Sequence, residues 1–255
     1  MKVDKHLDGA TSWMDLSTPD LEGSALFYGG LFGWDAPEGP PEVGGYRQAV
    51  LDGEVVAGLG PKMMPEQPTA WTPYIQTSDI DGTVDKATSL GATVLAPKME
   101  VMDFGHMAIV KDPIGAVFGL WQPNTMMGSG RKDEHGSWAW TELTTPDLDG
   151  SATFYTSLFG WQPAPSAVGS SEYREMKVGD SSVAGLMARP AMMPDEVPNY
   201  WGIYFTVDSL DEAVAYLNAN GAEILVGPMA IDPGTFLQFR DPQGAVVGLL
   251  EPKSS

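Results

Sequence analysis

The sequence contains no cysteine and only three histidines among its 255 residues. The lack of cysteine excludes disulfide bonds, a thiol nucleophile and a thiolate metal site. The sequence has no unbroken apolar run near the roughly 18 residues that span a bilayer, and its first residues, MKVDKHLDGATSW, lack the apolar region of a signal peptide. We therefore expect a cytoplasmic protein without a membrane partner.

Positive charge is also scarce. The chain carries 14 Lys and Arg against 34 Asp and Glu, which gives a formal net charge of -20. Such a chain repels phosphate backbones and anionic membrane surfaces, so we expect no nucleic-acid partner, whereas a cationic ligand would be attracted. The hydrophobic content of 43% is enough to form the core of one large or two ordinary domains.

The chain contains an internal repeat. The stretch STPDLEGSALFYGGLFGW at residues 17–34 returns as TTPDLDGSATFYTSLFGW at residues 144–161. The segment VAGL occurs in both halves, and DPIGAVFGL in the first half matches DPQGAVVGL in the second. A polar, Gly-rich stretch connects the two copies. We predict an N-terminal domain over residues 10–123, a linker over 124–137 and a C-terminal domain over 138–253.

Each half contains the same order of elements twice: a strand, a helix and several antiparallel strands. Residues 13–17 alternate as a strand does, Asp20 is a helix N-cap, and the helix is expected to end near Gly29 and Gly30 or just after. The dipeptide Asp52-Gly53 is typical of a tight hairpin. The sequence therefore predicts an α+β protein of four similar modules.

These motifs resemble the vicinal oxygen chelate superfamily, which includes glyoxalase I, bleomycin-resistance and fosfomycin-resistance proteins and extradiol dioxygenases. The carrying residues are PDLEGSALFYGGLFGW with its copy PDLDGSATFYTSLFGW, and the endings DPIGAVFGLWQ and DPQGAVVGLLE. The resemblance covers residues 12–252 and is closest to a tandem, two-repeat bacterial branch. It implies four βαβββ modules in two tandem glyoxalase-like repeats, each forming an open, curved, antiparallel-rich sheet cup with helices outside.

The resemblance also implies where a metal would bind. In metal-using members, ligands come from the start of a module's opening strand and from a Glu in its closing strand. Here the opening positions are Trp13, Thr72, Trp140 and Gly202, and the closing positions are Gly58, Gly119, Gly185 and Gly248. Such a site needs three or four nitrogen or oxygen donors, which Trp and Gly side chains do not supply. We predict no metal ligands and no cofactor.

If the opening-strand position that holds the ligand in the similar family faces the cup, strand alternation predicts which other side chains face the two cups. The expected ligand-binding residues are Trp13, Tyr74, Gln76 and Trp121 in the first half, and Trp140, Tyr204 and Thr206 in the second. Trp and Tyr suit a pocket because they combine a large apolar area with a polar tip. Plain core packing explains aromatic strand residues equally well.

Two acidic residues at equivalent positions, Asp15 and Glu142, are predicted to face the cups alone. Burial raises the pKa of a lone carboxyl, which suits a general acid or base, and we take both as candidate catalytic residues. Two alternatives remain open at this point. The carboxylates could form salt bridges with Arg47 and Arg174, or they could contact a cationic group of a ligand.

The sequence favours a binding protein for an apolar or aromatic small molecule, either a metabolite or an antibiotic, that works without the family's metal. The alternative is a glyoxalase-like lyase or a dioxygenase- or hydroxylase-type enzyme of small-molecule metabolism or detoxification. Methionine pairs at 63–64, 126–127 and 192–193 are candidates for flexible apolar lids or for gap filling. Because four modules in one chain supply what two-module relatives obtain by dimerising, we expect a monomer or a weak homodimer.

Overall fold

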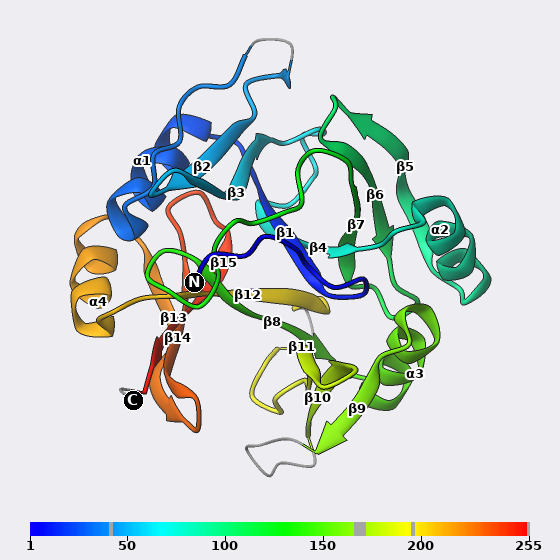
Figure 1. Ribbon diagram of the computed structural model, residues 1–255. Helices are drawn as coiled ribbons and strands as arrows, with labels where there is room; N and C mark the ends of the chain where they lie inside the picture. The colour runs from blue at the N-terminus through cyan, green and yellow to red at the C-terminus, as the bar shows by residue number, and fades with distance from the viewer. Residues whose placement is uncertain (41–42, 166–171, 195–196, 254–255) are drawn as a thin grey trace.

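The computed structural model describes residues 1–40, 43–165, 172–194 and 197–253 (Figure 1). The first half contains β1 (Thr11–Thr18), α1 (Leu21–Phe32), β2 (Arg47–Leu51), β3 (Glu54–Pro61), β4 (Ala70–Gln76), α2 (Ile80–Ser89), β5 (Thr93–Val101), β6 (Gly105–Lys111) and β7 (Val117–Pro123). The second half contains β8 (Trp138–Thr145), α3 (Leu148–Phe159), β9 (Gln162–Pro165), β10 (Tyr173–Val178), β11 (Ser181–Ala188), β12 (Tyr200–Thr206), α4 (Leu210–Ala219), β13 (Glu223–Ile231), β14 (Gly234–Arg240) and β15 (Val246–Pro252). Within the described ranges, no helix is long and apolar enough to cross a membrane.

Each half forms its own sheet from two modules. The strand order is β2-β3-β1-β4-β7-β6-β5 in the first sheet and β13-β14-β15-β12-β8-β11-β10-β9 in the second. At the centre of each sheet, the opening strands of the two modules pair antiparallel, β1 with β4 and β8 with β12. The predicted α+β fold is therefore confirmed, and the modules that share a sheet are neighbours in the chain.

The repeated sequence encodes a capped helix. The Asp20 side chain accepts a hydrogen bond from the Gly23 backbone N–H at 2.9 Å, and Asp147 accepts one from Gly150 at 2.8 Å. Helix α1 continues past Gly29 and Gly30 to Phe32, and Gly33 follows with a φ of 73°, a left-handed conformation that glycine adopts without strain.

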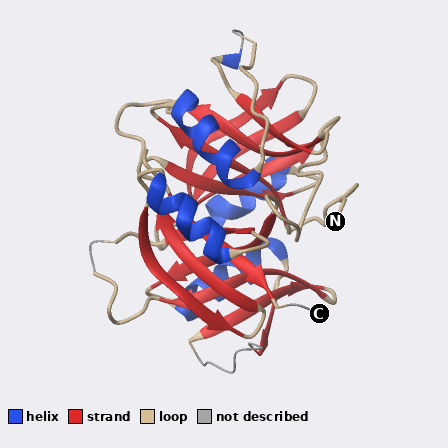
Figure 2. Ribbon diagram, turned by 90° about the vertical axis from the view of Figure 1, so that its left-hand side faces the viewer, coloured by secondary structure: helices blue, strands red, loops and turns tan. Residues whose placement is uncertain are grey.

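The hydrophobic cores join modules across the two halves. One core contains side chains of α1, β1 and β3 together with α4, β12 and β14, and a second contains side chains of α2, β6 and β7 together with α3 and β11. Figure 1 shows α1 beside α4 and α2 beside α3, and Figure 2 shows the first of these pairs at the junction between the halves. The helix-bearing faces of both sheets therefore pack together.

Two buried hydrogen bonds also cross between the halves. The Tyr28 hydroxyl of α1 donates to the Asp241 carboxylate at 2.7 Å, and the Tyr155 hydroxyl of α3 donates to Asp112 at 2.9 Å. Asp112 and Asp241 begin the two Asp-Pro turns, whose backbone N–H groups they also bind. The Phe-Tyr and Asp-Pro motifs are duplicated together because each half supplies the partner of the other.

Candidate functional site

The sheet face opposite the helices carries aromatic residues around one carboxylate in each half. We define the N-terminal cup by Trp13, Asp15, Tyr46, Tyr74 and Trp121, and the C-terminal cup by Trp140, Glu142, Tyr173, Tyr204 and Gln238. The strand register places Asp15 beside Gly58 and Thr72, and it places Glu142 beside Gly185 and Gly202. The two carboxylates therefore occupy equivalent positions in their sheets.

In the N-terminal cup, the carboxylate is supplied with hydrogen-bond donors by the protein itself. Asp15 Oδ1 accepts from Trp13 Nε1 at 2.7 Å and from the Tyr46 hydroxyl at 2.5 Å. Burial raises the pKa of Asp15, and hydrogen bonds from Tyr46, Trp13 and Tyr74 oppose that rise. This carboxylate is held in a closed network within the chain.

The aromatic side chains of the N-terminal cup form a small core of their own. Trp13, Tyr74 and Trp121 are 2%, 4% and 3% exposed, and Phe104, Met107 and Met126 pack against them. The core-packing interpretation therefore describes this cup. Its aromatic rings are covered by the chain.

The connection between the halves supplies part of that cover. Trp121 Nε1 donates to the Met126 carbonyl oxygen at 3.0 Å, and the Ser129 N–H donates to the Ser12 carbonyl oxygen at 2.7 Å. The segment appears in green in Figure 1, where it runs from β7 across the N-terminal sheet. Of the candidate lid methionines, Met126 packs on the cup, whereas Met63 and Met64 are exposed.

In the C-terminal cup, fewer side chains donate hydrogen bonds to the carboxylate. Trp140 Nε1 donates to the Tyr173 hydroxyl at 2.9 Å, whereas the equivalent Trp13 donates to its carboxylate. The Tyr204 hydroxyl lies 3.4 Å from Glu142 Oε1 and accepts from Gln238 Nε2 at 2.8 Å. Burial raises the pKa of Glu142 to about 7, while hydrogen bonds from Tyr173 and Tyr204 act in the opposite direction.

The rim of the C-terminal cup is also more polar and more exposed. Trp140 and Leu250 are partly exposed, whereas the equivalent Trp13 and Trp121 are buried, and Tyr173 and its equivalent Tyr46 are both partly exposed. Glu175 of β10 accepts a hydrogen bond from Ser182 and pairs with Lys177 at 3.6 Å. The equivalent positions in the first half are Gln48, Val55 and Val50. Solvent and solutes therefore reach more of the second cup's polar groups.

Tyrosine rings cover the glycines at the closing positions where the family resemblance places metal ligands. A Cβ added at Gly58 would lie 1.8 Å from the Tyr46 hydroxyl oxygen, and one at Gly119 would lie 2.2 Å from the Tyr74 ring. The same arrangement places Tyr173 over Gly185 and Tyr204 over Gly248. Glycine is required at these positions because a tyrosine occupies the space of a side chain.

This donor set does not fit a divalent metal. Each cup offers one carboxylate, and burial raises the pKa of Tyr46, Tyr74 and Tyr204 well above the usual range, so these hydroxyls stay protonated. Within the described part of the chain, His, Cys, Asp and Glu residues form no group of three or more that could hold a metal ion.

Two of the predicted ligand-binding residues lie apart from the carboxylates. Gln76 ends β4, where its side-chain amide donates to the His6 carbonyl oxygen at 2.8 Å. Thr206 ends β12 and is 2% exposed, and its backbone pairs with Ser137. Neighbouring backbone segments cover both positions, which strand alternation alone does not reveal.

The proposed salt bridges between the cup carboxylates and arginine are wrong. Arg47 pairs with Glu22 at 2.7 Å and Arg174 pairs with Asp149, both on the helix side of their sheets. Tyr46 and Tyr173, the residues just before them, face the carboxylates instead. Because successive strand residues point to opposite faces, only one member of each Tyr-Arg pair reaches the cup.

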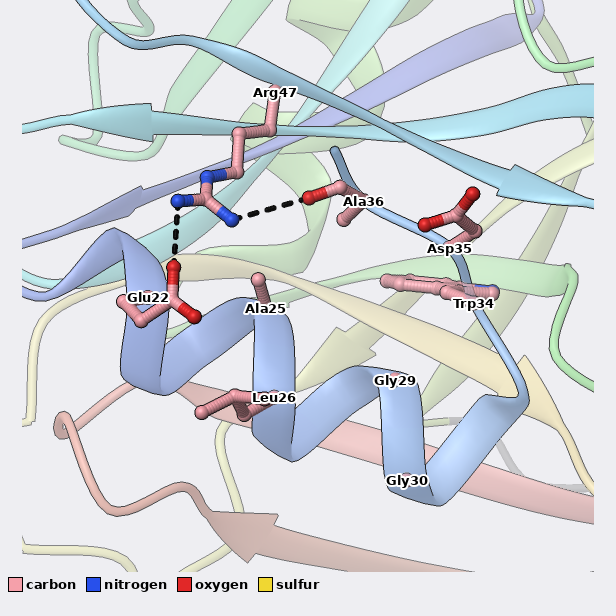
Figure 3. A pocket seen from close by; sticks show the side chains of 9 residues that line it. All are labelled: Glu22, Ala25, Leu26, Gly29, Gly30, Trp34, Asp35, Ala36 and Arg47. Carbon is pink, nitrogen blue, oxygen red and sulfur yellow. Dashed lines mark hydrogen bonds and ion pairs between the residues drawn. The ribbon is translucent and has the colours of Figure 1, made fainter. Parts of the chain in front are cut away.

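A separate pocket of about 320 Å³ lies beside α1 (Figure 3). Arg47 crosses it, donating to Glu22 and to the Ala36 carbonyl oxygen at 3.2 Å. Its lining residues are Glu22, Ala25, Leu26, Gly29, Gly30, Trp34, Asp35, Ala36 and Arg47. None of them belongs to either cup. In the second half, the residues equivalent to 35–38 form β9 and pair with β10.

Comparisons with known proteins give one consistent result. Residues 137–249 match the model of the glyoxalase/bleomycin resistance protein/dioxygenase superfamily, and residues 13–121 match a glyoxalase-like domain. CFP32 of Mycobacterium tuberculosis, provisionally named a glyoxylase, is 37% identical over 98% of both chains. The anthracycline biosynthesis protein DnrV of Streptomyces peucetius is 31% identical, covering 95% of this chain and 93% of its own.

Solved structures share the fold at low sequence identity. A Mn(II)-bound glyoxalase from Novosphingobium aromaticivorans matches with a TM-score of 0.67 and 15% identity, over 96% of this chain and 83% of that one. The 2,3-dioxygenase LapB from Pseudomonas sp. KL28 matches with a TM-score of 0.62 and 13% identity, over 94% and 91%. The chain therefore belongs to the glyoxalase/bleomycin resistance protein/dioxygenase superfamily, as two tandem glyoxalase-like repeats.

Proposed function

We propose that the protein binds an aromatic small molecule, a metabolite or an antibiotic, in its C-terminal cup, and that it does so without a divalent metal. The single observation that carries this proposal is the contrast between the two carboxylates. Asp15 accepts from both Trp13 and Tyr46, whereas Trp140, the equivalent of Trp13, donates to Tyr173 instead of Glu142 and is partly exposed. A carboxylate in such surroundings gains by meeting a donor from a ligand.

The similar proteins support an aromatic ligand. DnrV is named for the biosynthesis of anthracyclines, an aromatic compound class, and its similarity extends over both repeats. The faces of Trp140, Tyr173 and Tyr204 offer stacking surfaces for such a molecule. The acidic charge of the chain disfavours anionic ligands at the same time.

Titration of the intrinsic tryptophan fluorescence with a commercial anthracycline tests the proposal. We expect saturable quenching in the wild type, loss of most of that quenching in Trp140→Phe, and retention of it in the matched variant Trp13→Phe. Absence of saturable binding would overturn the proposal, and so would quenching that depends on Trp13 rather than on Trp140. Stoichiometric, tightly bound metal in the purified protein would overturn its metal-free part.

A second candidate function is an enzyme that moves a proton at Glu142. The pKa of about 7 favours it, because a carboxyl that titrates near neutral pH serves as both acid and base. Incubating candidate ligands in D₂O with wild type and with Glu142→Gln separates the two functions. If the wild type catalyses deuterium exchange into the ligand and Glu142→Gln does not, the protein is an enzyme. Binding without exchange supports the binding protein.

A further inference from the structure

Glu142 lies among acidic and phenolic side chains. The nearby titratable groups are Tyr173 and Glu175 of β10 and Tyr200 and Tyr204 of β12. Lys177 of β10 pairs with Glu175. Within the described ranges, no basic side chain forms an ion pair with Glu142. An ionised Glu142 therefore lacks the counter-charge that partly buried carboxylates usually have.

Beside Glu142 lies a glycine that the fold itself does not require. A Cβ added at Gly202 would lie 3.6 Å from the Glu142 carbonyl oxygen, 3.6 Å from the Tyr200 ring and 3.8 Å from the Tyr204 ring, which are ordinary contacts. The four tyrosine-covered glycines differ, because a Cβ there would lie within 2.2 Å of a tyrosine. The N-terminal cup has Thr72 at the position equivalent to Gly202.

A glycine inside a strand often marks a place where a ligand approaches the backbone closely. Gly202 is buried, and the absence of a Cβ there leaves a crevice of methyl size that the Tyr200 and Tyr204 rings border, next to Glu142 in the strand register. The crevice therefore combines two aromatic walls with a carboxylate that lacks a cation. Aromatic faces and a carboxylate together form a typical environment for an ammonium group.

We propose that the C-terminal cup selects flat aromatic molecules that carry an ammonium group, with Gly202 letting the ligand lie against β12 and Glu142 accepting the ammonium hydrogen bonds. This inference rests on the proposed function, since it names the class of ligand for the same cup. It assigns the two residues separable tasks. Gly202 provides space for any aromatic ligand, and Glu142 provides the preference for positive charge.

A matched pair of probes tests the preference. Naphthylmethylamine is protonated at neutral pH and naphthylmethanol is its neutral counterpart. By isothermal titration calorimetry at pH 7, we expect the amine to bind about tenfold or more tighter than the alcohol to the wild type, because a hydrogen bond to a charged group contributes that much. In Glu142→Gln, we expect the two affinities to become equal within about twofold, through weaker binding of the amine.

Proton release provides a second readout. Because the pKa of Glu142 is about 7, roughly half of the protein carries the proton at pH 7, and an ammonium ligand favours the ionised form. Titrations in buffers of different ionisation enthalpy should therefore show release of up to about half a proton with the amine and little release with the alcohol. Glu142→Gln should release no proton with either probe.

The variant Gly202→Ala tests the crevice. Its added methyl group makes only ordinary contacts, so the thermal midpoint should stay equal to or above that of the wild type, while both probes bind about tenfold more weakly. Thr72→Gly, the reverse change in the N-terminal cup, should leave the affinities unchanged. Retained affinity in Gly202→Ala would overturn the assignment of the crevice.

The possible failures are distinguishable. Equal binding of amine and alcohol by the wild type would overturn the ammonium preference and leave an aromatic binding site. Absence of binding for both probes, together with absence of anthracycline quenching, would overturn the proposed function and this inference together. Tighter binding of the alcohol than of the amine would contradict the role of Glu142 directly.

Discussion

In the N-terminal cup, Trp13 and Tyr46 both donate to Asp15, and the segment around Met126 packs on the aromatic rings. In the C-terminal cup, Trp140 donates to Tyr173 instead of Glu142, and Trp140 is partly exposed whereas Tyr204 is buried. In both cups, tyrosine rings cover the glycines at the closing positions. The two cups therefore differ by one methylene in the acid, by the donor that Trp13 or Trp140 supplies, and by the cover from Met126.

Two cups of the same backbone geometry need not have the same function. Three features recur in both halves: the residues of the sheet framework, the helix caps, and the tyrosines that cover glycines. The residues that differ are those next to the carboxylate, such as Thr72 against Gly202, and those at the rim. We therefore expect the first cup to contribute stability and the second to contribute binding.

The largest expected effect is on stability, from truncation of the equivalent tryptophans. Trp13→Ala should lower the free energy of unfolding by about 3–5 kcal/mol, because it leaves a cavity in a buried cluster. Trp140→Ala should cost less than about 2 kcal/mol, because its side chain is partly exposed. Urea unfolding followed by circular dichroism measures both. Equal losses would remove the distinction between the cups.

The next effect is the pH dependence that Glu142 adds to stability. Its pKa is raised from 4.5 to about 7 in the folded protein, so its stabilising contribution is complete below pH 4.5 and is lost as the pH rises through 7. Between pH 5 and 8, the wild type should lose about 2–3 kcal/mol relative to Glu142→Gln, as measured by urea unfolding at each pH. Glu66→Gln, at an exposed position, provides the matched control variant.

A smaller effect is expected from opening the N-terminal cup. Met126→Ala should lower the free energy of unfolding by about 1–2 kcal/mol and shift tryptophan emission to the red, because Met126 packs against the cluster of Trp13, Tyr74 and Trp121. The neighbouring Met127 is 39% exposed and gives the matched control Met127→Ala. If the two variants behave alike, Met126 does not act as the cover of this cup.

The smallest effect concerns the arginines on the helix side. Glu22→Gln and Asp149→Asn each remove the partner of one arginine, and both acids are largely exposed. Each variant should change the free energy of unfolding by less than about 1 kcal/mol, because exposed ion pairs contribute little. Neither should change the affinity for the naphthyl probes. A change in affinity would show that the helix side acts on a cup.

Local sequence signals predicted the framework well. The N-cap at Asp20 and the hairpin at Asp52-Gly53, with φ values of 47° and 82°, are confirmed. Such features depend on a few neighbouring residues, so a short motif is enough to specify them. The two cups also follow from strand alternation, which placed Trp13, Tyr74 and Trp121 in one cluster.

Other parts of the site depend on contacts that short patterns do not encode. Tyr46 and Tyr173 are not among the cup residues predicted from the sequence. Charge attraction favoured the neighbouring Arg47 and Arg174 as partners of the carboxylates, whereas strand alternation allows only one residue of each Tyr-Arg pair to face the cup. The glycines opposite them, Gly58 and Gly185, were the available signal, since they leave room for a ring. The sequence gives Met126 only as one of several candidate lid residues. Its position over the N-terminal cup does not follow from the sequence, because a polar, Gly-rich connection has no periodic pattern.

The exchanged bonds from Tyr28 to Asp241 and from Tyr155 to Asp112 also have an evolutionary consequence. A single repeat would have to find these partners in a second identical copy, and every mutation would then appear in both sites at once. Fusion of the two repeats into one chain keeps both hydrogen bonds in every molecule and lets each repeat mutate separately. Mutations can then accumulate in one cup while the equivalent residues of the other cup stay as they are.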